Sequence, residues 1–280
     1  MRVDLHLHTT ASDGLLEPAA LVSAVQAASL QVFSVTDHDT VDALPEVEAQ
    51  ARALGLRLIP GIELSAMWHS VEFHILGYFV DPADATLLAF LQARREARRT
   101  RLQAMLNRLR ALGMMVEADE VLARAQDGNV GRPHVARLLV ERGFVASTDE
   151  AFERYLGDGR PAYVPRPDVT VGDAIQAIHD SGGLASLAHP GLHNRDDAVP
   201  DLVGAGLDAI EAYHVCHSAG ITGHYRRLAA RGGLLLTGGS DFHGGTGRDH
   251  GPVPGMPCLP EAEFVRLEAS VHARRAAMRR

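Results

Sequence analysis

The chain is poor in several residue types, and each shortage excludes something. It contains no lysine, so all 27 basic side chains are arginines, and only two of its 280 residues are cysteines. Cys216 and Cys258 cannot form the disulfide framework of a small secreted protein, so we expect free thiols in a reducing compartment. No apolar run reaches the roughly 18 residues that a membrane span needs. Residues 1–6 also lack the apolar core of a signal peptide, and we expect a cytoplasmic location without membrane attachment.

Charge and aromatic content limit the partners. The formal net charge is −8, and aromatic residues make up 5% of the chain, with a single tryptophan. An acidic chain with few aromatic rings is a poor platform for long nucleic acid. A phosphorylated ligand is still compatible with this charge, because bound divalent cations reverse its sign inside a site.

Strand-like and helix-like segments alternate at both ends of the chain. Short apolar or alternating runs at 32–35, 56–62 and 184–188 are separated by segments of helical periodicity, which predicts an α/β fold with a parallel sheet or barrel. A chain of 280 residues suits one such barrel with an insertion. From 82 to 165 only helical periodicity appears. We therefore predict a barrel built from 1–81 and 166–280, with the helical insertion 82–165 lying over its mouth.

The positive signal is the number and placement of the 15 histidines. Metal-ligand residue types follow predicted strands at His6 and His8, at Asp37, His38 and Asp39, at Glu63, at His189, and at Asp241 and His243; Asp13 and His74 accompany them. The carboxyl ends of parallel barrel strands meet on one face, and residues i and i+2 of a strand point the same way. The pattern therefore predicts one site into which these side chains converge.

The ligand types indicate which metals fit. Imidazole and carboxylate without thiolate favour Zn, Mn or Fe over Ca and Mg. More than four candidate ligands indicate more than one ion, with a carboxylate such as Glu63 as the bridge. Each residue also has an ordinary structural interpretation: His74 as a core histidine, His189 as a strand end, and Asp13 as part of an Asx turn. The recurrence of the same residue types at strand ends favours the metal site.

These segments resemble a known family. The segments His6-x-His8, Asp13-Gly14, Thr36-Asp37-His38-Asp39, Gly61-Ile62-Glu63, His74, Ala188-His189-Pro190 and Gly239-Ser240-Asp241-x-His243 are similar, in order, to the motifs of the PHP (polymerase and histidinol phosphatase) family. The resemblance covers almost the whole chain. It implies a distorted (β/α)7 barrel holding three divalent ions, usually Mn and sometimes Zn or Fe. The helical insertion and Gly131-Arg132-Pro133-His134 resemble the stand-alone branch that includes 3′,5′-nucleotide phosphatases and a 5′–3′ exoribonuclease.

The resemblance also implies a role for each residue. The first ion would be held by His6, His8, Glu63 and Asp241, the second by Glu63, His74 and His189, and the third by Asp13, His38 and His243. Asp37 and Asp39 would hydrogen-bond a ligand histidine rather than bind metal. Three divalent ions against three carboxylates leave about +3, which suits a phosphate monoester dianion. The implied function is hydrolysis of nucleotide phosphate monoesters, with short RNA as a further substrate and no obligate protein partner.

Several residues are candidates for contacts with the substrate. Arg132 and His134 lie where a helix is predicted to begin, so they could bind a second phosphate or form an ordinary capping turn. His193, His214 and His217 follow predicted strands and could position substrate, protonate the leaving oxygen or serve the fold. The arginine-rich segment 94–110 is either a solvated helix face or a basic strip for RNA.

Three other functions are compatible with parts of the pattern. One is a histidinol-phosphate-type phosphatase, which a substrate screen would separate from a nucleotide phosphatase. Another is a non-catalytic or proofreading module of a polymerase, which the complete ligand set disfavours. The third is a metal-dependent amidohydrolase, but the chain has no lysine to bridge two metals.

Overall fold

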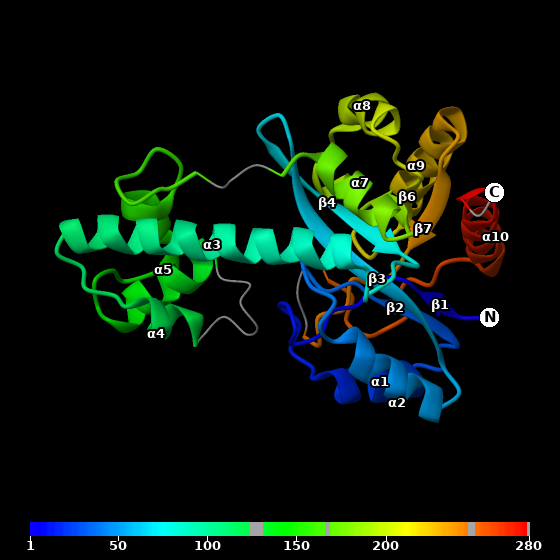
Figure 1. Cartoon of the computed structure of the whole chain (residues 1–280), viewed down its shortest axis with the longest axis horizontal. Helices are drawn as coiled ribbons and strands as arrows, with labels where there is room; N and C mark the ends of the chain where they lie inside the picture. The colour runs from blue at the N-terminus through cyan, green and yellow to red at the C-terminus, as the bar shows by residue number, and fades with distance from the viewer. Residues whose placement is uncertain (124–130, 166–168, 246–249, 279–280) are drawn as a thin grey trace. The chain divides into compact units, whose positions relative to one another are not determined.

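The computed structural model describes residues 1–123, 131–165, 169–245 and 250–278. It divides into two compact units, which are described separately: Met1–Ala89 with Val169–Arg280, and Phe90–Asp168. The first unit holds one seven-stranded sheet in which the strands follow one another in sequence order, β1 to β7 (Figure 1). The strands are β1 (Val3–Asp4), β2 (Val32–Val35), β3 (Arg57–Trp68), β4 (Val71–Tyr78), β5 (Leu184–Leu187), β6 (Ala209–Tyr213) and β7 (Leu235–Gly238).

The sheet is mixed rather than parallel throughout. Strands β1, β2 and β3 pair in parallel, as do β5, β6 and β7, but β4 is antiparallel to both β3 and β5. The predicted parallel order is therefore wrong at β4. Only two residues, His69 and Ser70, separate β3 from β4, and so short a connection forms a hairpin because a parallel crossover needs a dozen residues or more.

The barrel closes between its first and last strands. The amide of Leu5 donates to Gly238 O (3.2 Å), and the amide of His8 donates to Phe242 O (3.0 Å). A Cβ added to Gly239 would lie 2.4 Å from the backbone nitrogen of His6, so only glycine allows the two segments to approach this closely. The predicted distorted seven-stranded α/β barrel is confirmed.

Helices pack around this barrel. They are α1 (Pro18–Ala27), α2 (Leu44–Ala53), α7 (Val171–Asp180), α8 (Val199–Gly204), α9 (Ala219–Gly232) and α10 (Glu261–Met278), with 3₁₀ turns at Pro190–Leu192 and Asp196–Ala198. Helix α7 contacts β3, β4 and β5, whereas α10 contacts β7 (Figure 1). Tyr78, Phe33 and Phe264 are among the largest fully buried side chains of the unit. The strand ends that carry polar residues are thus supported by an apolar core. None of the described helices is long and apolar enough to cross a membrane.

The second unit is helical. The long helix α3 (Ala85–Ala111) leads into it, followed by α4 (Ala118–Leu122), α5 (Arg132–Glu141), α6 (Thr148–Ala151) and a π-helical turn at Phe152–Leu156. The helical spacing of Leu102, Met105, Leu106, Leu109 and Leu112 predicts an apolar stripe; the first four are buried in the core of this unit, whereas Leu112 is 46% exposed. The predicted boundary at 165/166 adjoins residues 166–168, which lie outside the described residues. The placement of this unit over the barrel mouth stays a prediction.

Asp4 joins the two ends of the barrel. Its fully buried carboxylate accepts four hydrogen bonds: from the amides of His6 (3.1 Å), Ser240 (3.0 Å) and Gly255 (2.6 Å), and from the Ser240 hydroxyl (2.6 Å). Burial raises the pKa of Asp4, while these hydrogen bonds act in the opposite direction.

We predict that Asp4→Ala lowers the free energy of unfolding by about 3 kcal/mol or more, since it leaves buried donors unpaired at a cost of about 1–3 kcal/mol each. Urea denaturation followed by circular dichroism measures this loss. Asp180→Ala, on the exposed end of α7, is the matched control. A loss below about 1 kcal/mol in Asp4→Ala would show that barrel closure does not depend on this carboxylate.

Candidate metal centre

The barrel unit brings together all nine residues predicted to bind metal. His6 and His8 follow β1, His38 follows β2, His189 follows β5, and Asp241 and His243 follow β7. Asp13 lies in the turn between β1 and α1. One position differs from the prediction: Glu63 lies inside β3, which continues to Trp68. His74 lies within a strand, as the alternation over 71–80 predicted, but that strand, β4, is antiparallel. The hairpin register sets His74 opposite Ser65, so the hairpin rather than a strand end delivers this histidine.

A first group of atoms surrounds one point at the bottom of the site. His6 Nε2 and His8 Nε2 both lie 3.3 Å from Glu63 Oε2. The same two nitrogens lie 3.3 and 3.2 Å from Asp241 Oδ1. All four side chains are buried. Two imidazoles and two carboxylates therefore converge here.

The other oxygen of Glu63 faces a second group. Glu63 Oε1 lies 3.0 Å from His74 Nδ1 and 3.2 Å from His189 Nε2. His38 Nδ1 lies 3.4 Å from the first oxygen, Oε2. The two oxygens of one carboxylate thus face different sets of histidines, which is the geometry of a bridging ligand.

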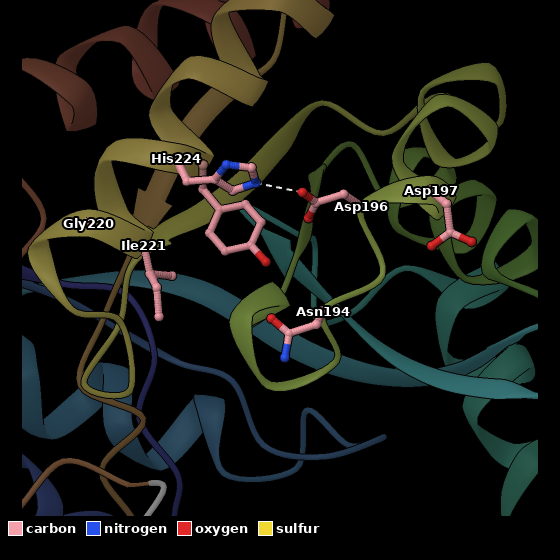
Figure 2. Close-up of a pocket in the computed structure, with 7 residues that line it drawn as sticks. Asn194, Asp196, Asp197, Gly220, Ile221 and His224 are labelled. Carbon is pink, nitrogen blue, oxygen red and sulfur yellow. Dashed lines mark hydrogen bonds and ion pairs between the residues drawn. The ribbon is translucent and has the colours of Figure 1, made fainter.

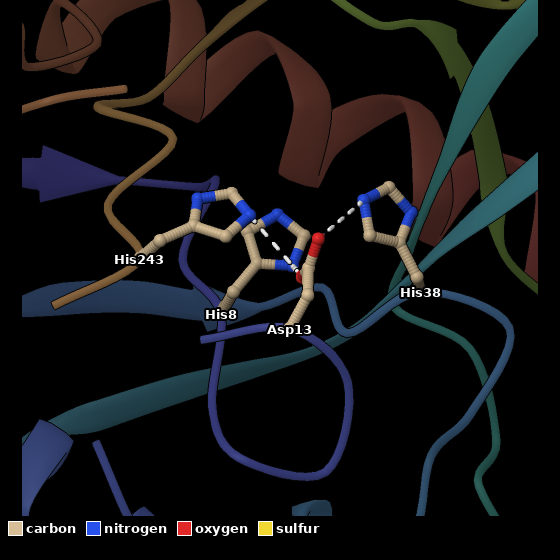
Figure 3. A group of neighbouring side chains, drawn as sticks. All are labelled: His8, Asp13, His38 and His243. Carbon is tan, nitrogen blue, oxygen red and sulfur yellow. Dashed lines mark ion pairs between the residues drawn. The ribbon is translucent and has the colours of Figure 1, made fainter. Parts of the chain in front are cut away.

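A third group lies around Asp13 (Figure 3). Asp13 Oδ1 is 3.2 Å from His243 Nε2, and Asp13 Oδ2 is 3.7 Å from His38 Nε2. His8 contributes its other nitrogen, Nδ1, 3.7 Å from Asp13 Oδ1. The Asp13 side chain is 55% exposed, so this group is the open side of the site.

The donor set suits divalent metal ions. Nitrogen and oxygen ligands about 2.0–2.2 Å from a common ion lie roughly 3.0–3.5 Å from one another, which is the spacing within the first two groups. Three buried nitrogens, His8 Nε2, His74 Nδ1 and His243 Nε2, form no hydrogen bond with the described residues although carboxylate oxygens lie 3.0–3.3 Å away. Close approach without hydrogen-bond geometry is expected when both atoms point at a third body between them.

Without cations, the carboxylates draw protons onto two of the histidines. Burial disfavours the charged form of His8, but Asp241 and Glu63 outweigh it and raise the pKa of His8 to about 10. The pKa of His6 is likewise raised well above its usual value against the effect of burial, by Asp241, Glu211 and Glu63. Burial opposes ionisation of Glu63 as well, yet the surrounding histidines hold its pKa well below the ordinary value. Metal ions would take the place of these protons, because a ligand imidazole must be neutral.

Glu211, in the middle of β6, was not predicted. Its fully buried carboxylate binds His6 Nδ1 through Oε1 (3.0 Å) and accepts the amide of His189 through Oε2 (2.7 Å). The first contact directs His6 Nε2 toward the first group. The second holds His189, whose φ of 26° is unusual for a non-glycine residue and costs about 1–3 kcal/mol. The signal in the sequence was a single acid inside an otherwise apolar strand.

Two histidines extend the site around Asp241. His214 Nε2 lies 3.4 Å from Asp241 Oδ2, and His250 Nδ1 lies 3.2 Å from the same oxygen. His214 was a predicted site residue. His250 was missed, because no strand or helix pattern in the sequence marks its position.

Asp37 and Asp39 support the site by holding the chain segments that carry its residues. Asp37 accepts hydrogen bonds from the amide and hydroxyl of Thr9 (2.7 and 2.6 Å) and from the hydroxyl of Ser12 (2.7 Å). We had predicted that Asp37 hydrogen-bonds a ligand histidine. Its hydrogen bonds to described residues instead hold the turn before Asp13. Asp39 accepts the amide of Ser65 at 3.3 Å, and so joins the β2 loop to β3.

Two other predicted residues flank the second group. His217 uses both ring nitrogens on backbone, accepting from Gly191 (3.1 Å) and donating to Ala212 O (3.0 Å), which favours a structural role. His193 packs edge-on against Phe73, and its ring centre lies 5.8 Å from that of His189. Burial and the neighbouring histidines lower the pKa of His193 to about 4, so the ring is neutral at neutral pH.

The predicted phosphate-binding residues lie in the helical unit. Arg132 is the first residue of α5, with Pro133 second, and its guanidinium pairs with Asp158 Oδ1 at 2.7 Å. The same guanidinium lies 5.5 Å from the ring centre of Tyr163. His134 accepts the amide of Gly131 through Nδ1 at 3.2 Å. Both residues thus take part in the local structure at the start of α5.

Comparison with known proteins decides the family. A model described as PHP domain matches residues 4–126. The 5′-3′ exoribonuclease Rnm of Escherichia coli is 38% identical over 247 residues, which cover 86% of this chain and 84% of that protein. The 3′,5′-nucleoside bisphosphate phosphatase of Chromobacterium violaceum is 33% identical over 277 residues, covering 96% and 97%. This chain belongs to the PHP domain family.

Solved structures agree with this PHP assignment. An inferred metal-dependent phosphoesterase of Bifidobacterium adolescentis superposes with a TM-score of 0.77 at 29% identity, over 95% of each chain. A Chromobacterium violaceum protein described as an amidohydrolase, with bound sulfate and no metal, superposes with a TM-score of 0.76 at 32% identity, over 98% of this chain and 97% of that one. The PHP barrel and its helical unit thus have solved counterparts over nearly their full length.

We predict that Glu211→Gln weakens metal binding by about ten- to a hundredfold, the usual loss when a hydrogen-bond partner of a ligand histidine is removed. The variant preserves the size of the side chain and removes its charge. Competition with a chromogenic chelator gives the affinity directly, without reliance on turnover.

Glu261→Gln, at the exposed start of α10, is the matched control for this measurement. If Glu211→Gln and Glu261→Gln both bound metal as the wild type does, Glu211 would not orient His6 toward a metal.

Proposed function

We propose that this PHP protein is a divalent-metal-dependent phosphoesterase that removes the 3′-phosphate of nucleoside 3′,5′-bisphosphates. The observation that carries the proposal is the divided contact of Glu63, whose two oxygens face different sets of histidines at 3.0–3.4 Å. Two ions sharing a carboxylate suit in-line displacement at phosphorus. The relatives named as an exoribonuclease and a nucleoside bisphosphate phosphatase support the same reaction class.

We assign three ions, with manganese as the preferred metal and Zn or Fe as alternatives. The first would be held by His6, His8, Glu63 and Asp241, the second by Glu63, His74 and His189, and the third by Asp13, His38 and His243. Glu211 adds a fourth carboxylate to the balance, so three divalent ions leave a net charge of about +2 rather than +3. A phosphate monoester dianion matches this charge, whereas a neutral amide does not.

Residues of the chain orient the metal ligands and keep bulk water away from one side of the site. When bound, divalent ions lower the pKa of water and offset the charge that develops on the phosphoryl oxygens. Glu211 fixes the orientation of His6, and Asp37 fixes the turn that carries Asp13. The buried position of the first group excludes bulk water on that side, so the substrate approaches from the side of Asp13, where the site is exposed. No serine or cysteine nucleophile is required.

A second candidate function is the stepwise removal of nucleotides from the 5′ end of short RNA. The 38% identity to an exoribonuclease favours it. Both activities use the same metal centre, and they differ in whether the phosphate has one ester bond or two. An amidohydrolase, the description given to one solved neighbour, is disfavoured because the chain has no lysine to bridge two metals.

The deciding experiment is anaerobic reconstitution with Mn, followed by assays of phosphate release from nucleoside 3′,5′-bisphosphates and histidinol phosphate, of nucleotide release from 5′-phosphorylated oligoribonucleotides, and of amine release from amide substrates. We expect the bisphosphates to have the highest kcat/KM. A higher value for histidinol phosphate or for an amide would overturn the proposal, and a higher value for RNA would select the second candidate.

We predict about three Mn ions per chain in the reconstituted wild type and about one in Glu63→Gln, since the bridge serves two ions. Activity should fall by orders of magnitude in the variant, while circular dichroism stays that of a folded barrel. Glu46→Gln, in the first turn of α2, is the control. Normal metal content and turnover in Glu63→Gln would show that Glu63 does not bridge two ions. Full activity of the wild type with one bound ion would contradict the assignment of three ions.

We also predict that the substrate's second phosphate binds Arg132, assisted by His134, in place of Asp158. A charge-assisted hydrogen bond contributes about 1.5–3 kcal/mol, so Arg132→Ala should lower kcat/KM for a nucleoside bisphosphate by about ten- to a hundredfold. p-Nitrophenyl phosphate, which has one phosphate, should be hydrolysed as before. Arg142→Ala, at the other end of α5 and paired with Glu120, is the matched control. Equal losses on both substrates would mean that Arg132 serves the fold.

A further inference from the structure

A cavity of about 430 Å³ opens in the barrel unit beside the loop that follows His189 (Figure 2). Residues of that loop, Asn194, Asp196 and Asp197, form one wall, and Gly220, Ile221, His224 and Tyr225 of α9 form the other. Small-molecule sites usually measure about 300–1,000 Å³, so the cavity has room for a ligand part of modest size. None of these residues belongs to the metal centre described above.

The cavity adjoins the metal centre. Its wall residue Ile221 lies close to Gly191, where an added Cβ would meet Ile221 at 3.3 Å, and Gly191 is two residues from His189. A row of rings also joins the two places: the ring centres are 5.6 Å apart from His189 to His214, 5.4 Å from His214 to His217, and 5.3 Å from His217 to Tyr225. A ligand part in the cavity would therefore be a near neighbour of a phosphate at the metal centre.

One carboxylate in the cavity is held in place. His224 Nε2 lies 2.5 Å from Asp196 Oδ2, and the Tyr225 hydroxyl also binds Asp196. Burial and the charge of Asp196 raise the pKa of Tyr225 to about 12, so this hydroxyl keeps its proton and donates it. A carboxylate has about four acceptor positions, so Asp196 can accept further donors from a ligand.

The other residues that line the cavity offer a ligand further polar and apolar contacts. The Asn194 carboxamide makes no hydrogen bond with the residues that the structure describes, and Figure 2 shows it below Asp196. Ile221 and the partly exposed ring of His224 supply flat and apolar surface. Asp197 is neutralised by Arg195, which it binds with both oxygens at 2.8 Å.

The charge of the cavity excludes some occupants. A phosphate would be repelled by the carboxylate of Asp196, because no arginine is among the residues that line the cavity. A divalent cation is also disfavoured, because no metal-capable group found among the described residues includes Asp196, Asp197 or His224. A neutral ring whose edge donates hydrogen bonds is complementary to this surface.

From this arrangement we propose that the cavity binds the nucleobase of the nucleotide whose phosphate lies at the metal centre. In this proposal Asp196 and Asn194 accept hydrogen bonds from an exocyclic amino group of the base. The proposal rests on the proposed nucleotide phosphoesterase function. It assigns base recognition to the barrel unit itself, and it predicts a preference for bases that carry an amino group over bases that lack one.

The test compares adenosine 3′,5′-bisphosphate with purine riboside 3′,5′-bisphosphate, which lacks only the amino group. For the Mn-loaded wild type we expect a ratio of kcat/KM values of about ten to a hundred in favour of adenosine, as for a hydrogen bond to a charged group. In Asp196→Asn and Asn194→Ala the ratio should fall toward one. Asp180→Asn, an exposed residue of α7, should retain the wild-type ratio.

A ratio separates recognition from damage to the fold, because a loss of structure lowers both rates and leaves the ratio intact. A wild-type ratio near one, or an unaltered ratio in Asp196→Asn, would overturn the base site while leaving the phosphoesterase function standing.

If the wild type hydrolyses neither compound, the proposed bisphosphate phosphatase function fails, and binding of the free nucleosides decides the site. Saturation-transfer NMR should then show that adenosine binds more tightly than purine riboside in the wild type and not in Asp196→Asn. Equal binding of the two nucleosides to the wild type would overturn the site.

Discussion

The two oxygens of Glu63 face different sets of histidines, and the rest of the metal centre is arranged around this divided contact. A buried carboxylate is costly unless it is paired with cations or hydrogen-bonded. Here the partners are imidazoles from three strand connections and a hairpin, and two of the facing nitrogens, His8 Nε2 and His74 Nδ1, make no hydrogen bond with the described residues. The arrangement is therefore incompletely paired, and divalent ions between the ligands would supply the missing partners.

The mixed sheet makes the divided contact of Glu63 possible. A parallel strand would deliver side chains to the site only at its carboxyl end, whereas the antiparallel β4 delivers His74 from its interior, opposite Ser65 of β3. Glu63 likewise projects from within β3 because that strand continues to Trp68. One hairpin thus supplies both Glu63, the proposed bridging carboxylate, and His74, which strand ends alone would not bring together at the same point.

The sequence allowed the barrel, the helical segment and all nine candidate ligands to be predicted, because each depends on local patterns: strand alternation, HxH spacing and acids after apolar runs. It did not predict Glu211 or His250, since their importance depends on neighbours far away in the chain. The direction of β4 was also mistaken, because strand–helix alternation was extended across a connection too short to hold a helix. Asp37 was placed correctly near the site, but its hydrogen-bond partners depend on how the turn at Thr9 and Ser12 folds. In each case the missing information concerned contacts between segments.

The hydrogen bonds of Asp4 have a consequence for how the protein is made. They join residues 236 and 251 positions apart, and Asp241 is likewise far from His6 and His8 in the sequence, so neither the closing contact nor the first metal group can form until both distant segments have been synthesised. Contacts between such distant residues form slowly, because a long loop must close before any interaction compensates for it. His6 and His8 are synthesised long before Asp241, although Glu63 follows them much sooner. The nascent chain therefore presents these two histidines with only one of the two carboxylates that they face, and we expect the first group to be complete only once Asp241 has emerged.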